Sequence, residues 1–115
     1  MRILLVDDDK DVRETINLVL KLEHHEVIEA TDGRQAIELL GHDQFDLVIT
    51  DYVMPEMSGD LLAAEVKRLN PATPVIMITA NADLLPDSLR DVDQVLSKPF
   101  EVNELIKTIR EIGGL

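Results

Sequence analysis

The sequence contains no cysteine, and this absence removes two classes of site. Without thiols, the chain can form neither a disulfide framework nor a thiolate metal centre, so any metal must be held by oxygen or imidazole ligands. Basic residues are also few, since 11 Lys and Arg stand against 23 Asp and Glu for a formal net charge of -12. Because such a charge repels nucleic-acid phosphates and anionic membranes, we expect no direct binding of nucleic acid.

Long hydrophobic runs are missing as well. The first apolar run, residues 3–6, is followed by three aspartates and is too short and too acidic at its edge for a signal peptide. No later run approaches the length of a membrane span. With 115 residues, 45% of them hydrophobic, the chain has the size of one domain with a continuous core. We therefore expect a single domain over residues 1–115, no membrane attachment and a cytoplasmic location.

Short runs rich in Val and Ile alternate with longer segments of helical period, which is typical of a parallel sheet with crossover helices. The predicted strands are residues 3–6, 26–30, 47–50, 75–79 and 94–96. The predicted helices are residues 10–22, a segment capped by Thr31 or Asp32 and ended by Gly41, a segment capped by Ser58 and running to about Leu69, and residues 102–112. A weaker helical segment lies between Ala82 and Asp91. This pattern predicts an α/β fold with an open, doubly wound, five-stranded sheet and helices on both faces.

Polar residues follow the predicted strands at the points where they end. Asp7 and Asp8 follow the first strand, Asp51 follows the third, Thr79 ends the fourth and Lys98 follows the fifth. In open α/β sheets the site lies beyond the carboxyl ends of the strands, where the strand order reverses. If the first and third strands are neighbours, their carboxylates converge, and two charges ~4 Å apart repel by about 4 kcal/mol at an effective dielectric near 20. A hard divalent cation offsets this repulsion, and an all-oxygen ligand set suits Mg²⁺.

These residue types also match the requirements of phosphoryl transfer. A carboxylate can act as the nucleophile and form an aspartyl phosphate, and Asp51 is placed for this role. The Lys98 ammonium and the Thr79 hydroxyl can bind oxygens of the phosphoryl group. A single acid after a strand is usually a helix cap, which is the simplest interpretation of Asp9. The joint placement of the other polar residues on successive strand ends is what favours a site.

Four segments carry these residues, namely ILLVDDD at residues 3–9, DLVITDYVMPEMSG at residues 46–59, PVIMITA at residues 74–80 and SKPF at residues 97–100. They resemble the receiver domains of bacterial response regulators, and the resemblance covers essentially the whole chain. The resemblance implies the strand order 2-1-3-4-5 and the transfer of a phosphoryl group from a histidine kinase or phosphotransfer protein to Asp51. It further implies Mg²⁺ ligation by Asp7, Asp8, Asp51 and the main-chain carbonyl of Val53, phosphoryl binding by Thr79 and Lys98, and a cis Lys98–Pro99 bond. A downstream protein or output domain is implied too, but the sequence does not identify it.

Two features depart from the family pattern. Val95 stands three residues before Lys98, where an aromatic residue that relays the signal is common in the family. The segment between Thr79 and Lys98 is short and contains Pro86, and proline costs roughly 3 kcal/mol inside a helix. We therefore predict a fourth helix that is short or irregular.

Two other functions remain open. A receiver-like module can bind proteins without ever being phosphorylated. An aspartate-nucleophile phosphatase would share the metal, the acid, the threonine and the lysine, but it needs a general acid that commonly stands two residues after the nucleophile, where this chain has Val53. The sequence favours a signalling domain that promotes only its own phosphorylation and dephosphorylation.

Overall fold

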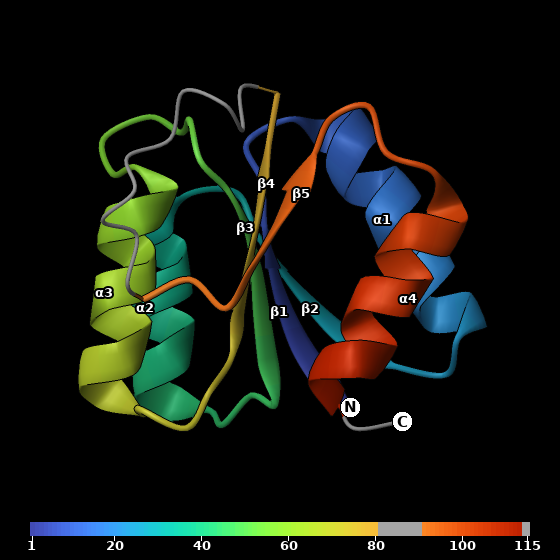
Figure 1. Ribbon diagram of the computed structural model, residues 1–115. Helices are drawn as coiled ribbons and strands as arrows, with labels where there is room; N and C mark the ends of the chain where they lie inside the picture. Colours follow the sequence, from blue (N-terminus) through green and yellow to red (C-terminus); the bar gives the residue numbers. More distant parts are fainter. Residues whose placement is uncertain (81–90, 114–115) are drawn as a thin grey trace.

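A five-stranded parallel sheet forms the centre of the molecule (Figure 1). The computed structural model describes residues 1–80 and 91–113. The strands are β1 (Arg2–Val6), β2 (Glu26–Ala30), β3 (Leu47–Asp51), β4 (Val75–Thr79) and β5 (Gln94–Ser97), and their order is β2-β1-β3-β4-β5. Every neighbouring pair is parallel, so the predicted fold class and strand order are confirmed.

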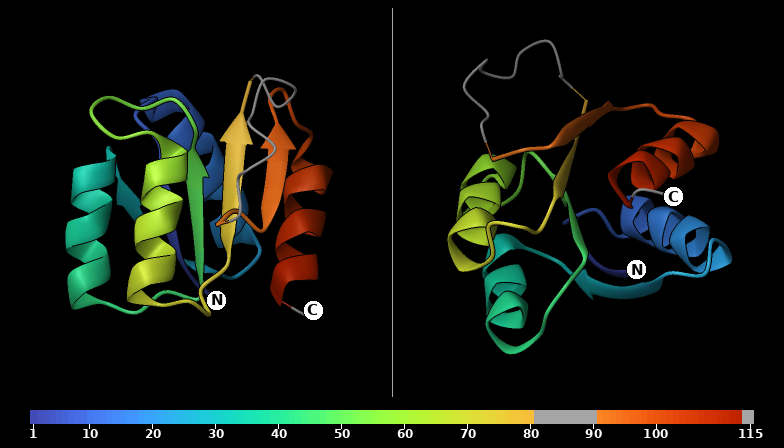
Figure 2. Two further views of the ribbon diagram at one scale, coloured as in Figure 1. Left: turned by 60° about the vertical axis from the view of Figure 1, so that its left-hand side comes forward. Right: turned by 60° about the horizontal axis from the view of Figure 1, so that its bottom comes forward.

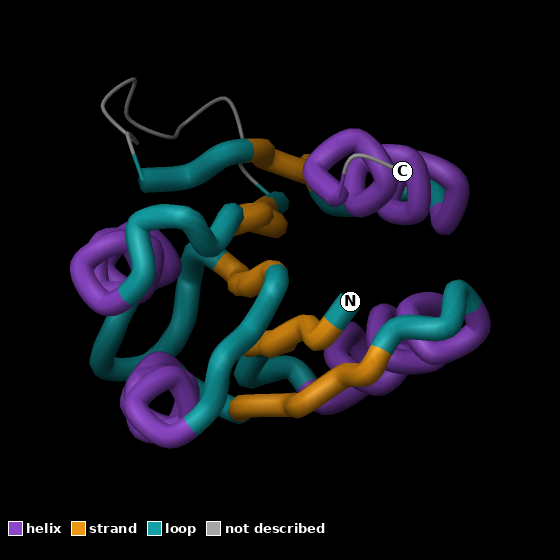
Figure 3. The backbone as a smooth tube through the Cα atoms, turned by 90° about the horizontal axis from the view of Figure 1, so that it is seen from below, coloured by secondary structure: helices purple, strands orange, loops and turns teal. Residues whose placement is uncertain are grey.

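The helices cover both faces of this sheet. The described residues form α1 (Lys10–Leu22), α2 (Gly33–His42), α3 (Gly59–Leu69) and α4 (Val102–Gly113). Figures 1 and 2 show α2 and α3 side by side on one face and α1 and α4 on the other, and the view from below in Figure 3 shows the sheet between these two layers. None of the helices in the described part of the chain is long and apolar enough to cross a membrane.

The core consists of two layers separated by the sheet. Successive side chains of a strand point to opposite faces, so β1 contributes Ile3 and Leu5 to the layer beneath α1 and α4, and Leu4 and Val6 to the layer beneath α2 and α3. The inner strands β1, β3 and β4 are almost entirely buried, whereas the edge strands β2 and β5 are partly exposed. The continuous apolar runs in the sequence therefore mark strands that are buried on both faces.

The helix ends agree with the sequence except at three positions, one of which is the end of α4, where the helix continues through Gly113 and not only to the predicted residue 112. The side chains of Asp9 and Asp32 cap α1 and α2 by accepting hydrogen bonds from main-chain amides, as predicted. Ser58 precedes α3 but makes no capping bond, because its hydroxyl instead bonds the side chain of Asp60. Gly41 does not end α2, which continues through His42, and its φ is not left-handed as a terminating glycine requires.

The chain is anchored where it enters β5. The Asp93 carboxylate accepts hydrogen bonds from the Val75 amide at 2.7 Å and from Lys67 Nζ at 2.9 Å, and Lys67 also donates to the main-chain oxygen of Thr73 at 2.8 Å. These bonds hold the start of β5 against α3 and β4. The short or irregular helix predicted around Pro86 falls outside the described residues and stays a prediction.

Candidate functional site

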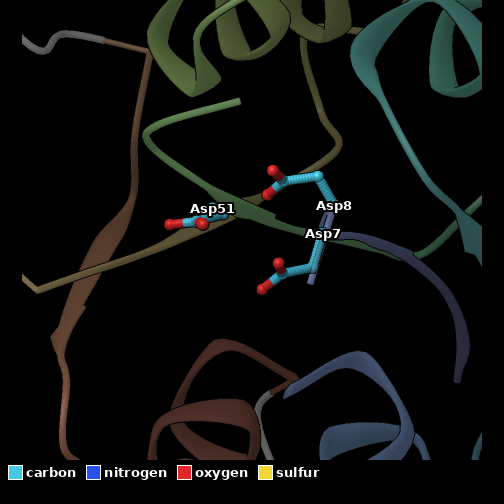
Figure 4. Close-up of side chains that lie close together, drawn as sticks. All are labelled: Asp7, Asp8 and Asp51. Carbon is cyan, nitrogen blue, oxygen red and sulfur yellow. The ribbon is translucent and has the colours of Figure 1, made fainter. Parts of the chain in front are cut away.

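Three carboxylates converge at the carboxyl edge of the sheet (Figure 4). β1 and β3 are adjacent, and the pairing of Val6 with Thr50 brings the next residues of the two strands, Asp7 and Asp51, to the same edge. Asp7, Asp8 and Asp51 each offer a carboxylate oxygen, and these oxygens all lie within 4.8 Å of one another. The predicted convergence of these side chains is therefore confirmed.

Asp7 is the buried member of this cluster, with 1% of its surface exposed. Burial raises the pKa of its carboxyl group, and the negative charges of Asp51 and Asp8 act in the same direction. The Asp9 amide, which donates to Asp7 Oδ1 at 2.9 Å, and the Lys98 ammonium only partly oppose this rise. Without a further cation, the structure therefore disfavours the charged form of Asp7.

Lys98 brings a positive charge to the cluster. Its ammonium nitrogen lies 3.4 Å from Asp51 Oδ2 and 3.8 Å from Asp7 Oδ2. The main-chain amide of Lys98 donates to the oxygen of Thr79 at 2.8 Å, and the Lys98–Pro99 peptide bond is cis, as the family resemblance implied. The end of β5 thus directs the lysine toward the ends of β1 and β3.

Asp51 is held by its own strand end and by the start of α3. The amide of Tyr52 donates to Asp51 Oδ1 at 2.8 Å, and the amide of Gly59 donates to the oxygen of Tyr52 at 2.8 Å. A Cβ atom on Gly59 would come within 2.2 Å of the main-chain oxygen of Asp51. Only glycine therefore allows α3 to begin this close to Asp51.

The donor set fits a magnesium ion. All three acidic side chains offer hard oxygen ligands, and one lysine cannot balance three carboxylates. The partly exposed Asp51 and the exposed Asp8 leave the cluster open to water and to a phosphate oxygen. A divalent cation would also relieve the unfavourable burial of charge at Asp7.

The other predicted site residues lie at this same edge. Thr79 ends β4 and is 1% exposed, and it pairs with Ser97, the residue before Lys98. The side chain of Val53 is 68% exposed in the loop after Asp51. Valine provides no acid at the position where a phosphatase commonly carries one, so no general acid stands two residues after Asp51.

One contact of this site was missed by the sequence reasoning. Arg13 Nη1 donates to the main-chain oxygen of Asp7 at 2.8 Å. A signal for it does exist, because Arg13 lies three residues before Ile16 and seven before Leu20, on the buried face of α1. A charged residue on such a face must find a buried partner, but the sequence does not say which one.

This combination of a doubly wound sheet and an acidic cluster with a lysine defines a receiver-type signalling domain. The sequence matches the response regulator receiver domain family over residues 3–110. The chain therefore belongs to this family, whose members are phosphoacceptor signalling domains of two-component systems.

Individual relatives agree with this assignment. The chain is 42% identical over 115 residues to the transcriptional regulatory protein CpxR of Escherichia coli, covering 96% of this chain and 48% of CpxR. It is 38% identical to the response regulator receiver protein CpdR of Brucella abortus, covering 96% of this chain and 95% of CpdR. The chain thus spans about half the length of CpxR but nearly all of CpdR.

Solved structures share the fold. The response regulator TrrA of Thermotoga maritima, solved in complex with Mg²⁺-BeF, superimposes with a TM-score of 0.90 at 30% identity, covering 96% of this chain and 97% of TrrA. A CheY-like receiver domain protein of Methanospirillum hungatei gives a TM-score of 0.92 at 27% identity, covering 98% of this chain and 94% of that protein.

Proposed function

We propose that Asp51 is the phosphoacceptor of this receiver domain, and that Asp7, Asp8 and Asp51 hold Mg²⁺ beside it. The observation that carries the proposal is the cluster itself, three carboxylate oxygens within 4.8 Å of one another with the Lys98 ammonium 3.4 Å from Asp51. A cation bound there supplies positive charge to the oxygens of the transferring phosphoryl group. The main-chain carbonyl of Val53 completes the protein ligands in this proposal.

In the transfer step, a carboxylate oxygen of Asp51 attacks the phosphorus in line with the leaving group. A phosphorus–oxygen bond to Asp51 forms while the bond to the donor nitrogen or oxygen breaks, and the donor leaves with the bonding electrons. The Tyr52 amide fixes Asp51 Oδ1 and thereby the orientation of the carboxylate before the attack. The protein is thus both the acceptor and the promoter of its own phosphorylation.

Lys98 and Thr79 bind the transferred phosphoryl group in this proposal. The Lys98 side chain is 24% exposed and its ammonium group is already paired with Asp51, so the ammonium can move to a phosphoryl oxygen while staying close to the carboxylate. The hydroxyl of Thr79, at the end of β4, binds another oxygen. Each donor offsets negative charge that the transfer brings to Asp51.

The phosphodonor in the cell is a histidine kinase or a phosphotransfer protein, as expected for a receiver domain. The phosphorylated domain then acts on a downstream protein or on an output domain in the same polypeptide, and CpxR, of which the matched region covers 48%, is a relative with further chain outside that region. The acidic net charge of -12 argues that this chain itself does not contact nucleic acid.

The test is to incubate the protein with a small-molecule phosphodonor, with and without Mg²⁺, and to measure the mass of the intact protein. We expect a Mg²⁺-dependent gain of one phosphoryl group in the wild type and no gain in Asp51→Asn. A matched control is Asp46→Asn, which changes an acid just before the opposite end of β3 and should be phosphorylated like the wild type.

The other outcomes distinguish the alternatives. No mass gain in the wild type would contradict the proposal and favour a receiver-like module that only binds proteins. Continuous release of phosphate from many donors would favour the phosphatase. A gain that persists in Asp51→Asn would place the acceptor elsewhere.

A further inference from the structure

The peptide of Asp7 is held on both sides by α1 and β2. Its amide donates to the oxygen of Ala30 at the end of β2 at 3.2 Å, and its carbonyl accepts from Arg13 Nη1 on α1 at 2.8 Å. Because Asp7 leaves β1 at this point, these two bonds determine the direction in which the loop carrying the acids departs from the sheet.

Arg13 is itself fixed. Its side chain is only 13% exposed, and its Nε donates to Glu29 Oε1 at 2.9 Å. The other oxygen of Glu29 accepts from Asn17 Nδ2 at 2.7 Å, so both carboxylate oxygens are engaged. Glu29 directly precedes Ala30, and the contacts therefore form a closed ring from Asp7 through Ala30, Glu29 and Arg13 back to Asp7.

We infer that Arg13 and Glu29 are positioning residues of the magnesium site. Neither is a metal ligand, but the ring orients the peptide of Asp7 and, through it, the adjoining Asp8. Asp8 is exposed, so its carboxylate depends on the loop for its place beside Asp51. This inference rests on the proposed function, since it assigns a role in binding the same metal ion. Groups that orient metal ligands commonly contribute ten- to a hundredfold to metal affinity.

Electrostatics and positioning predict opposite results when Arg13 is replaced. The Arg13→Gln variant loses a positive charge next to the acidic cluster, and Coulomb attraction alone would then make Mg²⁺ bind more tightly. If the guanidinium acts by holding the Asp7 peptide, the same substitution weakens binding. The direction of the change therefore separates the two effects.

The chain offers a closely matched control. Lys67 donates to one main-chain oxygen and to one carboxylate at nearly the same distances as Arg13, and its side chain is 21% exposed. It lies on α3 near the opposite edge of the sheet, where it contacts Thr73 and Asp93 rather than the acidic cluster. Lys67→Gln thus removes an equivalent structural contact without touching the loop of Asp7.

The experiment is to measure the Mg²⁺ dissociation constant by isothermal titration calorimetry at constant ionic strength, well below the unfolding temperature of each variant. We expect about tenfold weaker binding in Arg13→Gln and a change of less than about twofold in Lys67→Gln. In phosphorylation by a small-molecule donor, the Mg²⁺ concentration at half-maximal rate should rise in Arg13→Gln while the rate at saturating Mg²⁺ is kept. Unchanged or tighter Mg²⁺ binding in Arg13→Gln would overturn the inference, as would an equal loss in Lys67→Gln.

A second variant covers the case in which Arg13→Gln does not fold. Arg13→Lys keeps the charge, but its donors all lie on one nitrogen, whereas Arg13 reaches Glu29 with Nε and the Asp7 carbonyl with Nη1, so affinity should still fall. Wild-type affinity in Arg13→Lys would then overturn the inference. Failure of the proposed function has a different signature, because in that case the wild type itself would show no Mg²⁺ binding that depends on Asp8.

Discussion

At the residue scale, the burial of Asp7 in its charged form lowers the stability of the fold. Its carboxyl pKa is raised by burial and by the neighbouring acids, so the carboxyl group binds a proton more tightly in the metal-free folded state than in the unfolded chain. The protonated carboxyl group of Asp7 therefore stabilises the folded state relative to the charged form. This stabilisation is present below the ordinary pKa of an aspartate and is lost as the pH rises through the raised pKa. We therefore expect the free energy of unfolding of the Mg²⁺-free protein to fall as the pH rises through this range.

Asp7→Asn should remove this penalty. In the absence of divalent cations at neutral pH, we expect the variant to be more stable than the wild type by on the order of 1 kcal/mol, because a buried amide needs no counter-charge. Urea unfolding in the presence of a chelator measures the difference. Asp8→Asn, at an exposed position, is the control and should give a smaller gain. A less stable Asp7→Asn variant would contradict the interpretation of the pKa.

The acidic residues of the site could be predicted from the sequence, whereas the residues that hold them in position could not. Parallel strands present their carboxyl ends at one edge, so Asp7, Asp8 and Asp51 follow from the placement of the apolar runs. The role of Arg13 depends on its contact with Glu29, which lies 16 positions further along the chain and on another element. Helical periodicity places a residue on a face but does not name its partner across that face.

At the element scale, α1 ends in a hydrogen-bonded motif that contains one residue with an unfavourable backbone conformation. The amides of His24 and His25 donate to the oxygens of Lys21 and Leu20, which is the pattern of a Schellman motif. His24 has a φ of 68°. This left-handed conformation is unfavourable for a residue with a Cβ atom and natural for glycine.

His24→Gly should therefore stabilise the protein by about 1 kcal/mol. The measurement is the midpoint of thermal or urea unfolding. His25→Gly is the control and should destabilise the protein, because the φ of His25 is not positive, glycine adds freedom to the unfolded chain, and the contact of His25 Nδ1 with the Met1 amino group at 3.0 Å is lost. Stabilisation of both variants, or of neither, would show that the conformation of His24 is not the source of the effect.

Helix starts were more predictable than helix ends. Asp9 and Asp32 indicate the starts of α1 and α2, because a short acidic side chain can accept hydrogen bonds from the main-chain amides of the first helical turn that follows it. The sequence predicts that α2 ends at Gly41, which is one residue too early, because Gly41 has a helical neighbour on each side. Glycine ends a helix only where the left-handed conformation is used, and composition alone does not reveal that.

At the scale of the whole molecule, we propose that residues 1–115 are one domain. Both core layers share the same three inner strands, so neither layer can form without the sheet that carries the other. We expect one cooperative unfolding transition in urea, with an m-value of about 1–3 kcal/mol/M. Far-UV circular dichroism and the fluorescence of Tyr52, the single tyrosine, should report the same midpoint. Two separate midpoints would indicate two folding units.

The strand order also has a consequence for the protein during its synthesis. Among the strands of this sheet β1 is the first to be synthesised, yet it lies inside the sheet, where Ile3 is paired with Val27 on one side and with Leu47 on the other. A nascent chain that stops short of β3 leaves one long edge of β1 without hydrogen-bond partners, and such an edge is open to pairing with other chains. The acidic residues that follow both β1 and β3 therefore meet only after β3 has paired with this edge of β1.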